Sequence, residues 1–167
     1  PAPNLLVLDK LITVCEYKGI EPILIVTKTD LEEDRMLRGI YEKAGFRVIS
    51  LSNLNPVHLD EIRALLAGKI SAFAGNTGVG KSSLLNNLFP SLQLETADIS
   101  KKLGRGRHTT RHVTLYPANG GGFVADTPGF GTMELSQYEI IRKEELADCF
   151  REFRPYLGGC RFTGCSH

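Results

Sequence analysis

Eight consecutive residues, Gly75 to Ser82, have the composition and spacing of a loop that binds phosphate groups. They read Gly-Asn-Thr-Gly-Val-Gly-Lys-Ser and match the pattern GxxxxGK[ST] in full. Its glycines let backbone N–H groups turn toward phosphate oxygens, and the helix expected next adds its positive N-terminal end. Lys81 is expected to reach the outer phosphates, and the Ser82 hydroxyl to ligate magnesium. The predicted phosphate-binding residues are Gly75, Asn76, Thr77, Gly78, Val79, Gly80, Lys81, Ser82 and Ser83.

A second motif, Thr-Lys-Thr-Asp at residues 27–30, could select the base of a nucleotide. A carboxylate such as Asp30 can accept hydrogen bonds from both N1–H and the exocyclic amine of guanine, whereas adenine offers no such pair. The usual motif is NKxD, so Thr27 in place of Asn predicts weaker guanine binding with the discrimination retained. An isolated Asp here would be interpreted as a helix cap, but a nearby phosphate loop favours base recognition. The predicted base-binding residues are Thr27, Lys28 and Asp30, with Ser52 and Asn53 offering a backbone N–H to guanine O6.

Two further segments carry groups suited to the hydrolysis of a nucleoside triphosphate. The sequence Asp-Thr-Pro-Gly at 126–129 matches DxxG, so Asp126 is expected to hold magnesium through water and the Gly129 N–H to contact the γ-phosphate. Upstream, the sequence GRGRHTTR at 104–111 is expected to be a switch loop. Within it, Thr110 is our choice for the residue that closes over magnesium and the γ-phosphate. The predicted magnesium ligands are therefore Ser82, Thr110 and Asp126.

The residue after DTPG is Phe130, where Ras-like enzymes carry a glutamine that orients the attacking water. Phenylalanine cannot polarise water, so another residue must do so. Our hypothesis is that His108 reaches the water from the switch loop, and a solvated loop histidine is an equally open alternative. The predicted catalytic residues are Lys81, His108, Thr110 and Gly129.

The last eight residues, CRFTGCSH, place two thiols and an imidazole at the spacing C-x4-C-x-H. Such a cluster suits a tetrahedral structural zinc site. On spacing alone an exposed cysteine tail remains the alternative, because only three ligands are present. The predicted zinc ligands are Cys160, Cys165 and His167. The other two cysteines, Cys15 and Cys149, lie among apolar residues and are expected to pack in the core.

Strands and helices that alternate along the chain must position these groups. Apolar periodicity predicts helices over 5–19, 32–44, 55–66 and 81–88, strands over 22–27, 46–51 and 70–74, a hairpin of 112–116 with 123–125, and helix from 136 to 153. This order predicts an α/β fold with a largely parallel sheet, whose ligands bind at the carboxyl ends of the strands. Both nucleotide motifs follow predicted strands directly.

The composition is that of a globular protein with one main domain. Of 167 residues, 42% are hydrophobic and 23% charged, and neither a membrane span nor a signal peptide is evident, so we expect a cytosolic protein without membrane contact. The formal charge of +1 gives no strong general attraction to nucleic acid. A basic stretch over 101–111 is either a solvated loop or a contact for RNA phosphates or nucleotide.

The order of the motifs is unusual, because the base motif precedes the phosphate loop, the reverse of Ras-like GTPases. A circular permutation moves the termini without moving the site. In their order, TKTD, Ser52, GNTGVGKSS, GRGRHTT, DTPGF and C-x4-C-x-H resemble the circularly permuted GTPases that depend on the small ribosomal subunit, the RsgA/YjeQ family. The resemblance spans nearly the whole chain.

The resemblance implies a permuted P-loop GTPase domain over 1–135, with a guanine-binding half over 1–68 and a phosphate-loop and switch half over 69–135. Residues 136–167 would begin a helical zinc-binding domain. The implied activity is hydrolysis of GTP to GDP in late maturation of the small (30S) ribosomal subunit, with rRNA as partner; we expect a monomer. Family members also carry an N-terminal OB-type barrel, a strand before the first helix and a fourth zinc ligand, so the chain is expected to be a fragment.

Three rival functions remain at this point. One is a P-loop ATPase or kinase that happens to contain TKTD. Another is an RNA-binding module whose nucleotide is structural. The third is a permuted GTPase that acts on the large ribosomal subunit, against which the Cys-His tail argues.

Overall fold

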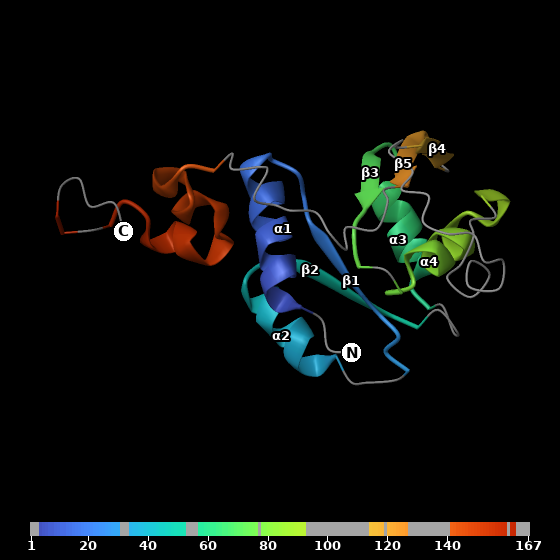
Figure 1. Cartoon of the computed structure of the whole chain (residues 1–167), viewed down its shortest axis with the longest axis horizontal. Helices are drawn as coiled ribbons and strands as arrows, with labels where there is room; N and C mark the ends of the chain where they lie inside the picture. Colours follow the sequence, from blue (N-terminus) through green and yellow to red (C-terminus); the bar gives the residue numbers. More distant parts are fainter. Residues whose placement is uncertain are drawn as a thin grey trace, which may run out of the picture. The chain divides into compact units, whose positions relative to one another are not determined.

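The computed structural model describes residues 4–30, 34–52, 57–76, 78–92, 114–118, 120–126, 141–159 and 161–162. Helices and strands alternate along most of this length, as the sequence predicts for an α/β fold (Figure 1). In chain order the elements are α1 (Leu5–Tyr17), β1 (Ile23–Thr27), α2 (Arg35–Lys43), β2 (Arg47–Leu51), α3 (Leu59–Leu66), β3 (Ile70–Phe73), α4 (Lys81–Leu88), η1 (Pro90–Leu92), β4 (Thr114–Ala118), β5 (Gly122–Asp126), η3 (Lys143–Glu145), η4 (Ala147–Cys149) and η5 (Arg151–Tyr156). No helix in the described ranges is long and apolar enough to cross a membrane.

The chain divides into two compact units. Unit 1 comprises Pro1–Ile25, Asp34–Ile49 and Glu134–His167, and unit 2 comprises Val26–Glu33 and Ser50–Met133. Both predicted nucleotide motifs, TKTD and the phosphate loop, therefore fall within unit 2.

Unit 1 is built on α1 and α2. Asn4 caps α1, since its side chain accepts a hydrogen bond from the Val7 N–H. Tyr41 is the buried residue of α2, and its hydroxyl donates to Asp9 on α1 over 2.6 Å. Burial and this carboxylate raise the Tyr41 pKa above its usual range. Two other apolar residues of α2 are exposed, Met36 to 76% and Ile40 to 45%.

In the C-terminal part of unit 1, the prediction of a helix continuing to residue 153 is wrong for the described residues. Residues 143–156 form the three short 3₁₀ helices η3, η4 and η5 instead. Phe150 is extended (φ −111°, ψ 113°) and separates η4 from η5, while Pro155 lies inside η5 and cannot donate a backbone hydrogen bond. The packing prediction for Cys149 is confirmed: it is 3% exposed, and burial raises the pKa of its thiol. Cys15 is half-buried.

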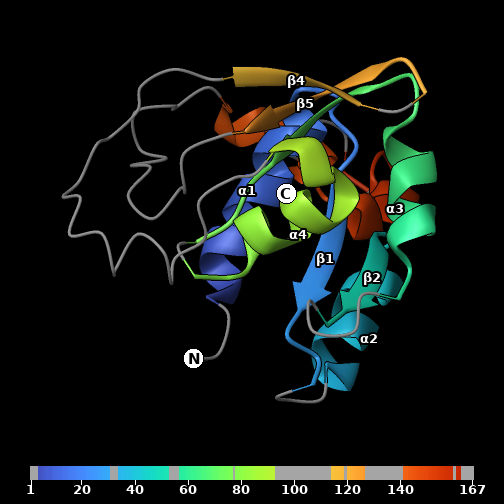
Figure 2. The ribbon, with the colours of Figure 1, turned by 90° about the vertical axis from the view of Figure 1, so that its right-hand side faces the viewer.

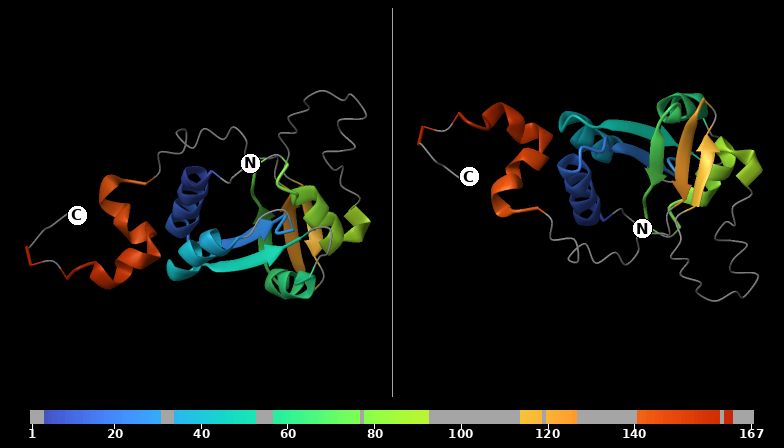
Figure 3. Two further views of the ribbon diagram at one scale, coloured as in Figure 1. Left: turned by 90° about the horizontal axis from the view of Figure 1, so that it is seen from below. Right: turned by 90° about the horizontal axis from the view of Figure 1, so that it is seen from above.

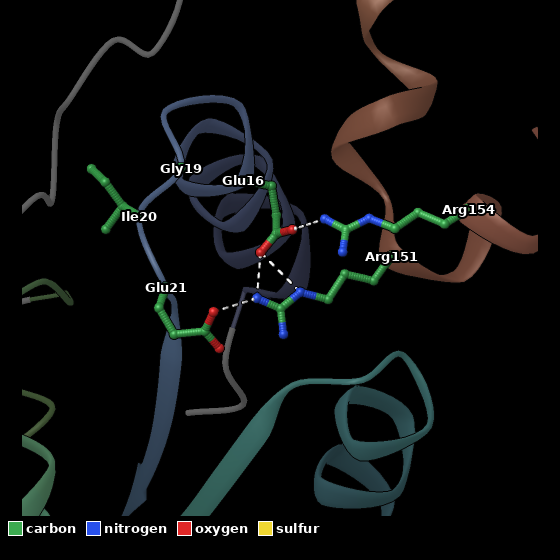
Figure 4. A pocket seen from close by; sticks show the side chains of 6 residues that line it. All are labelled: Glu16, Gly19, Ile20, Glu21, Arg151 and Arg154. Carbon is green, nitrogen blue, oxygen red and sulfur yellow. Dashed lines mark hydrogen bonds and ion pairs between the residues drawn. The ribbon is translucent and has the colours of Figure 1, made fainter.

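A cluster of charges joins α1 to η5 around an open pocket of about 360 Å³ (Figure 4). The Glu16 carboxylate accepts from Arg151 (2.6 and 2.9 Å) and from Arg154 (2.8 Å). Arg151 also donates to the Glu21 carboxylate and to the Gly45 carbonyl. These contacts join segments 135 residues apart in the sequence. The pocket is lined by Glu16, Gly19, Ile20, Glu21, Arg151 and Arg154.

Unit 2 contains a three-stranded sheet in the order β3-β5-β4 (Figure 3). Strand β3 runs parallel to β5, and β4 pairs with β5 antiparallel as the predicted hairpin. Helices α3 and α4 pack together, and α3 also contacts β5 (Figure 2). Their buried residues form the core of this unit with Val124 of β5; these are Ile62, Leu66, Leu84, Leu85 and Leu88.

The remaining strands, β1 and β2, form a separate two-stranded sheet, so the described strands make two sheets rather than the one that was predicted. Leu24 is the buried residue of β1, and the other four residues of this strand are half-exposed. Helix α3 begins at Leu59, later than predicted, after His58 in a left-handed conformation (φ 68°).

Candidate nucleotide-binding site

The phosphate loop connects β3, which ends at Phe73, to α4, which begins at Lys81. Gly78 (φ 84°) and Gly80 (φ 92°) adopt left-handed conformations that favour glycine, so the loop needs these residues for its shape. Gly80 is the N-cap of α4, and its carbonyl accepts the first helical hydrogen bond from Leu84. The helix thus starts with backbone N–H groups and the positive end of its dipole at the loop. The predicted residues Lys81, Ser82 and Ser83 occupy its first turn and are half-exposed.

The TKTD motif contacts the phosphate loop directly, although some fifty residues separate them in the sequence. The Thr27 hydroxyl donates to the Val79 carbonyl over 2.5 Å. The Lys28 ammonium donates to the Gly78 carbonyl over 2.7 Å. Lys28 has a positive φ of 60°, a strained value for a residue other than glycine. Two side chains of the base motif therefore fix the backbone of the phosphate loop.

Asp30, the predicted base-reading carboxylate, is exposed and oriented by a neighbour. The Ser52 hydroxyl donates to Asp30 Oδ1 over 2.6 Å. The chain segments that carry them also meet, because the Thr29 N–H donates to the Leu51 carbonyl over 3.5 Å. Sequence reasoning gave Ser52 only a backbone contact with guanine and missed this side-chain role. The signal available was that Ser52 directly follows a strand, as the TKTD motif does.

Asp126 of the DxxG motif ends β5 at the level of the phosphate loop. In the parallel pairing its backbone lies opposite Phe73, the last residue of β3 and two residues before Gly75. The DxxG motif thus begins beside the phosphate loop. Hydroxyl and carboxylate oxygens of the predicted set are donors that magnesium prefers, so the chemistry of Ser82 and Asp126 fits this ion.

Other predicted site residues lie outside the described residues. From the nucleotide site these are Asn53, Thr77, His108, Thr110 and Gly129; the zinc ligands Cys160, Cys165 and His167 also belong here. Among the described ranges, no three histidine, cysteine, aspartate or glutamate residues are grouped to hold a metal ion. The roles of these residues stay predictions.

The family model of the RsgA GTPase matches residues 1–136 of the chain. The chain belongs to the RsgA GTPase family. The resemblance drawn from the motif order is therefore confirmed. The chain is 49% identical over 168 residues to the small ribosomal subunit biogenesis GTPase RsgA 2 of Oceanobacillus iheyensis, which covers 97% of this chain and 56% of that protein. It is 44% identical to the small ribosomal subunit biogenesis GTPase RsgA of Caldanaerobacter subterraneus, covering 100% of this chain and 56% of that protein.

Two solved structures are similar over the whole chain. YjeQ from Thermotoga maritima matches with a TM-score of 0.72 at 32% identity, and 55% of that chain is covered. YloQ, a circularly permuted GTPase, matches with a TM-score of 0.71 at 33% identity, and 53% of that chain is covered. The likeness supports the predicted permuted GTPase fold. The chain spans about half the length of the relatives it matches.

Proposed function

We propose that this chain is the nucleotide-binding part of a GTPase that hydrolyses GTP to GDP and phosphate. The observation that carries the proposal is the pair of hydrogen bonds from Thr27 and Lys28 to the Val79 and Gly78 carbonyls. They bring a guanine-selecting motif and a phosphate loop into one site, whose two parts can bind the two ends of one nucleotide. If the chain were a P-loop ATPase with an incidental TKTD sequence, nothing would require these contacts.

Each part of the site has a separate role. Asp30, oriented by Ser52, accepts the two N–H groups of guanine, and the loop from Gly75 to Gly80 surrounds the phosphates. Lys81 neutralises charge on the outer phosphates, as its place after the loop requires. Ser82, Thr110 and Asp126 would hold a magnesium ion, which would supply neutralisation of the charge that develops during phosphoryl transfer.

Two residues of the switch segments complete the catalytic proposal. Gly129 contacts the γ-phosphate through its backbone N–H. His108 orients the attacking water, the role of the glutamine that Ras-like enzymes carry at the position of Phe130. Both roles rest on the motifs of the sequence.

The relatives' names support a place for this GTPase in the biogenesis of the small ribosomal subunit. We infer that the nucleotide acts as a switch in late maturation of that particle, that rRNA is bound, and that the protein is a cytoplasmic monomer. Residues 1–135 form the GTPase domain in this proposal. Residues 136–167 begin a zinc-binding domain with Cys160, Cys165 and His167 as ligands, because thiolate and imidazole donors suit zinc.

GTP turnover by the full-length protein, titrated with purified small ribosomal subunits, tests the proposal. Large subunits are the matched control for the particle, and Lys81→Ala is the control for the site. We expect strong stimulation by the small subunit alone, and no turnover by Lys81→Ala. Slow turnover without stimulation would contradict the ribosomal role and leave the proposed GTPase activity supported. Absence of guanine nucleotide binding would contradict both.

A further inference from the structure

Arg63 of α3 contacts the C-terminal end of α4, the helix that follows the phosphate loop. Its guanidinium donates to the Asn87 carbonyl over 3.0 Å and to the Leu88 carbonyl over 3.4 Å. A third donor reaches the Asp60 carboxylate, one turn earlier on α3, over 2.7 Å. The Arg63 side chain is 35% exposed, whereas that of Asp60 is 97% exposed. The contacts with α4 are thus the more enclosed part of this arrangement.

The last carbonyl groups of a helix have no intrahelical donor, and they form the negative end of its dipole. Arginine suits this place because its planar fork donates several hydrogen bonds in fixed directions and carries a positive charge. Helix α4 has only eight residues. A helix this short moves as a rigid rod, so a contact that fixes its last turn also constrains its first turn, which holds Lys81 and Ser82.

The two helices joined by Arg63 each follow one part of the nucleotide site. Helix α3 follows Ser52, which orients Asp30, and α4 follows the phosphate loop. At the loop, Thr27 and Lys28 connect the same two parts directly. Thr27 and Lys28 therefore join the base-reading part to the phosphate-binding part beside the loop, and Arg63 joins α4 to the helix that comes next after Ser52 in the chain.

We propose that Arg63 is a positioning residue for guanine nucleotide binding. By holding the last turn of α4, it sets the position of the phosphate loop relative to Asp30, so that one nucleotide fits both. The inference rests on the proposed function of this site. The proposal predicts different effects on two kinds of ligand. GDP must contact Asp30 and the phosphate loop at once, whereas inorganic triphosphate contacts the phosphate loop alone.

The test compares these two ligands, each with Mg²⁺, by titration calorimetry on full-length Arg63→Met. Methionine keeps a long apolar side chain but has no hydrogen-bond donor. If the variant leaves a smaller fraction of the protein with the phosphate loop correctly placed relative to Asp30, the apparent affinity for GDP falls in proportion. We expect GDP to bind about tenfold more weakly. The affinity for inorganic triphosphate should change by less than about twofold, since this ligand does not contact Asp30 and does not depend on its position. Arg38→Met is the matched control, because Arg38 is an exposed arginine that pairs with Glu42 within α2.

The ratio of the two affinities is the decisive quantity, since partial unfolding weakens both ligands equally and leaves the ratio unchanged. Arg63→Leu, which also has no hydrogen-bond donor and favours a helix, replaces Arg63→Met if the latter does not fold. An unchanged GDP affinity, or an equal loss for both ligands, would overturn the inference. A wild-type protein that binds no GDP would instead overturn the proposed function.

Discussion

For the single residue Thr27, the structure adds a contact that the sequence motif does not predict. A threonine in place of the usual asparagine predicts weaker guanine binding, because a hydroxyl replaces an amide. In the structure the hydroxyl donates to the Val79 carbonyl, so the residue connects the base motif to the phosphate loop. Its contribution is therefore the position of the loop, and one donor is sufficient for that.

Replacing Thr27 with valine removes this donor and keeps the shape of the side chain. We expect GDP affinity to fall about fivefold to tenfold, the usual effect of losing one hydrogen bond of about 1 kcal/mol and leaving its acceptor without a partner. Thr27→Ser keeps the hydroxyl and serves as the control, with affinity near that of the wild type. Equal GDP affinities for the valine and serine variants would show that the hydroxyl contact has no role in binding.

Glu145 provides a prediction about pH. Three hydrogen bonds from Arg142, through its backbone N–H and two guanidinium nitrogens, lower the pKa of the Glu145 carboxyl to about 2. Its pKa in the unfolded chain is about 4.3, so the contact stabilises the folded state above that pH. The stabilisation is lost as the pH falls from about 4 toward 2. A carboxyl titration followed by NMR should give the low value in the wild type and a higher one in Arg142→Gln, and identical values would contradict this account.

At the scale of elements, the start of β5 packs tightly against the turn that follows α3. The Phe123 N–H donates to the Lys69 carbonyl over 2.8 Å. A Cβ atom on Gly122 would lie 2.4 Å from that carbonyl oxygen and 2.6 Å from the Leu66 carbonyl oxygen. Both obstacles are backbone atoms, so they cannot rotate away as side chains do.

We therefore expect Gly122→Ala to lower the free energy of unfolding by roughly 2–4 kcal/mol, in the range of backbone-shifting overpacking. Gly39→Ala is the matched control, because Gly39 lies in α2 and an added Cβ meets nothing within 4 Å. That substitution should stabilise by about 0.5–1 kcal/mol through helix propensity. Urea unfolding of both variants measures the difference, and equal midpoints would contradict the packing argument.

The elements of the nucleotide site are also those that the sequence predicts best. Helix α4 begins at Lys81 and ends at Leu88 as predicted, because glycine at its start and a full loop motif mark it. The C-terminal region was predicted less well. Its apolar spacing resembles that of an α-helix, yet the extended Phe150 separates the 3₁₀ helices η4 and η5. Local periodicity does not reveal such breaks, since tertiary contacts decide them.

At the scale of the whole molecule, residues that are distant in the sequence form contacts that no local pattern predicts. The side-chain role of Ser52 and the capping of α4 by Arg63 are of this kind, and so is the cluster around Glu16. The Glu16 side chain is only 5% exposed and is paired with Arg151 and Arg154. The Arg151 guanidinium also lies over the Phe46 ring, 4.4 Å from its centre. This cluster joins the beginning of the chain to η5 within unit 1.

Removing Arg151 should therefore destabilise unit 1. Arg151→Met leaves a nearly buried carboxylate with fewer partners, and we expect a loss of about 3 kcal/mol, as for breaking an enclosed ion pair from one side. Hydrogen exchange should accelerate in α1 and η5. Arg154 still pairs with Glu16 in that variant, so the carboxylate keeps one of its two arginine partners. The double variant Arg151→Met/Glu16→Gln removes the incompletely compensated charge and should recover part of the stability. A double variant no more stable than the single one would contradict the account.

We propose that TKTD and the phosphate loop form one site that reads guanine through Asp30. Xanthine carries a carbonyl where guanine has its exocyclic amine, so an amide at position 30 can donate where a carboxylate accepts. The most direct measurement is the affinity of the wild type and of Asp30→Asn for GDP and for xanthosine diphosphate. We expect Asp30→Asn to bind GDP roughly a hundredfold more weakly, the cost of two charge-assisted hydrogen bonds, and to prefer xanthosine diphosphate. Equal GDP affinities for the two proteins would contradict the claim.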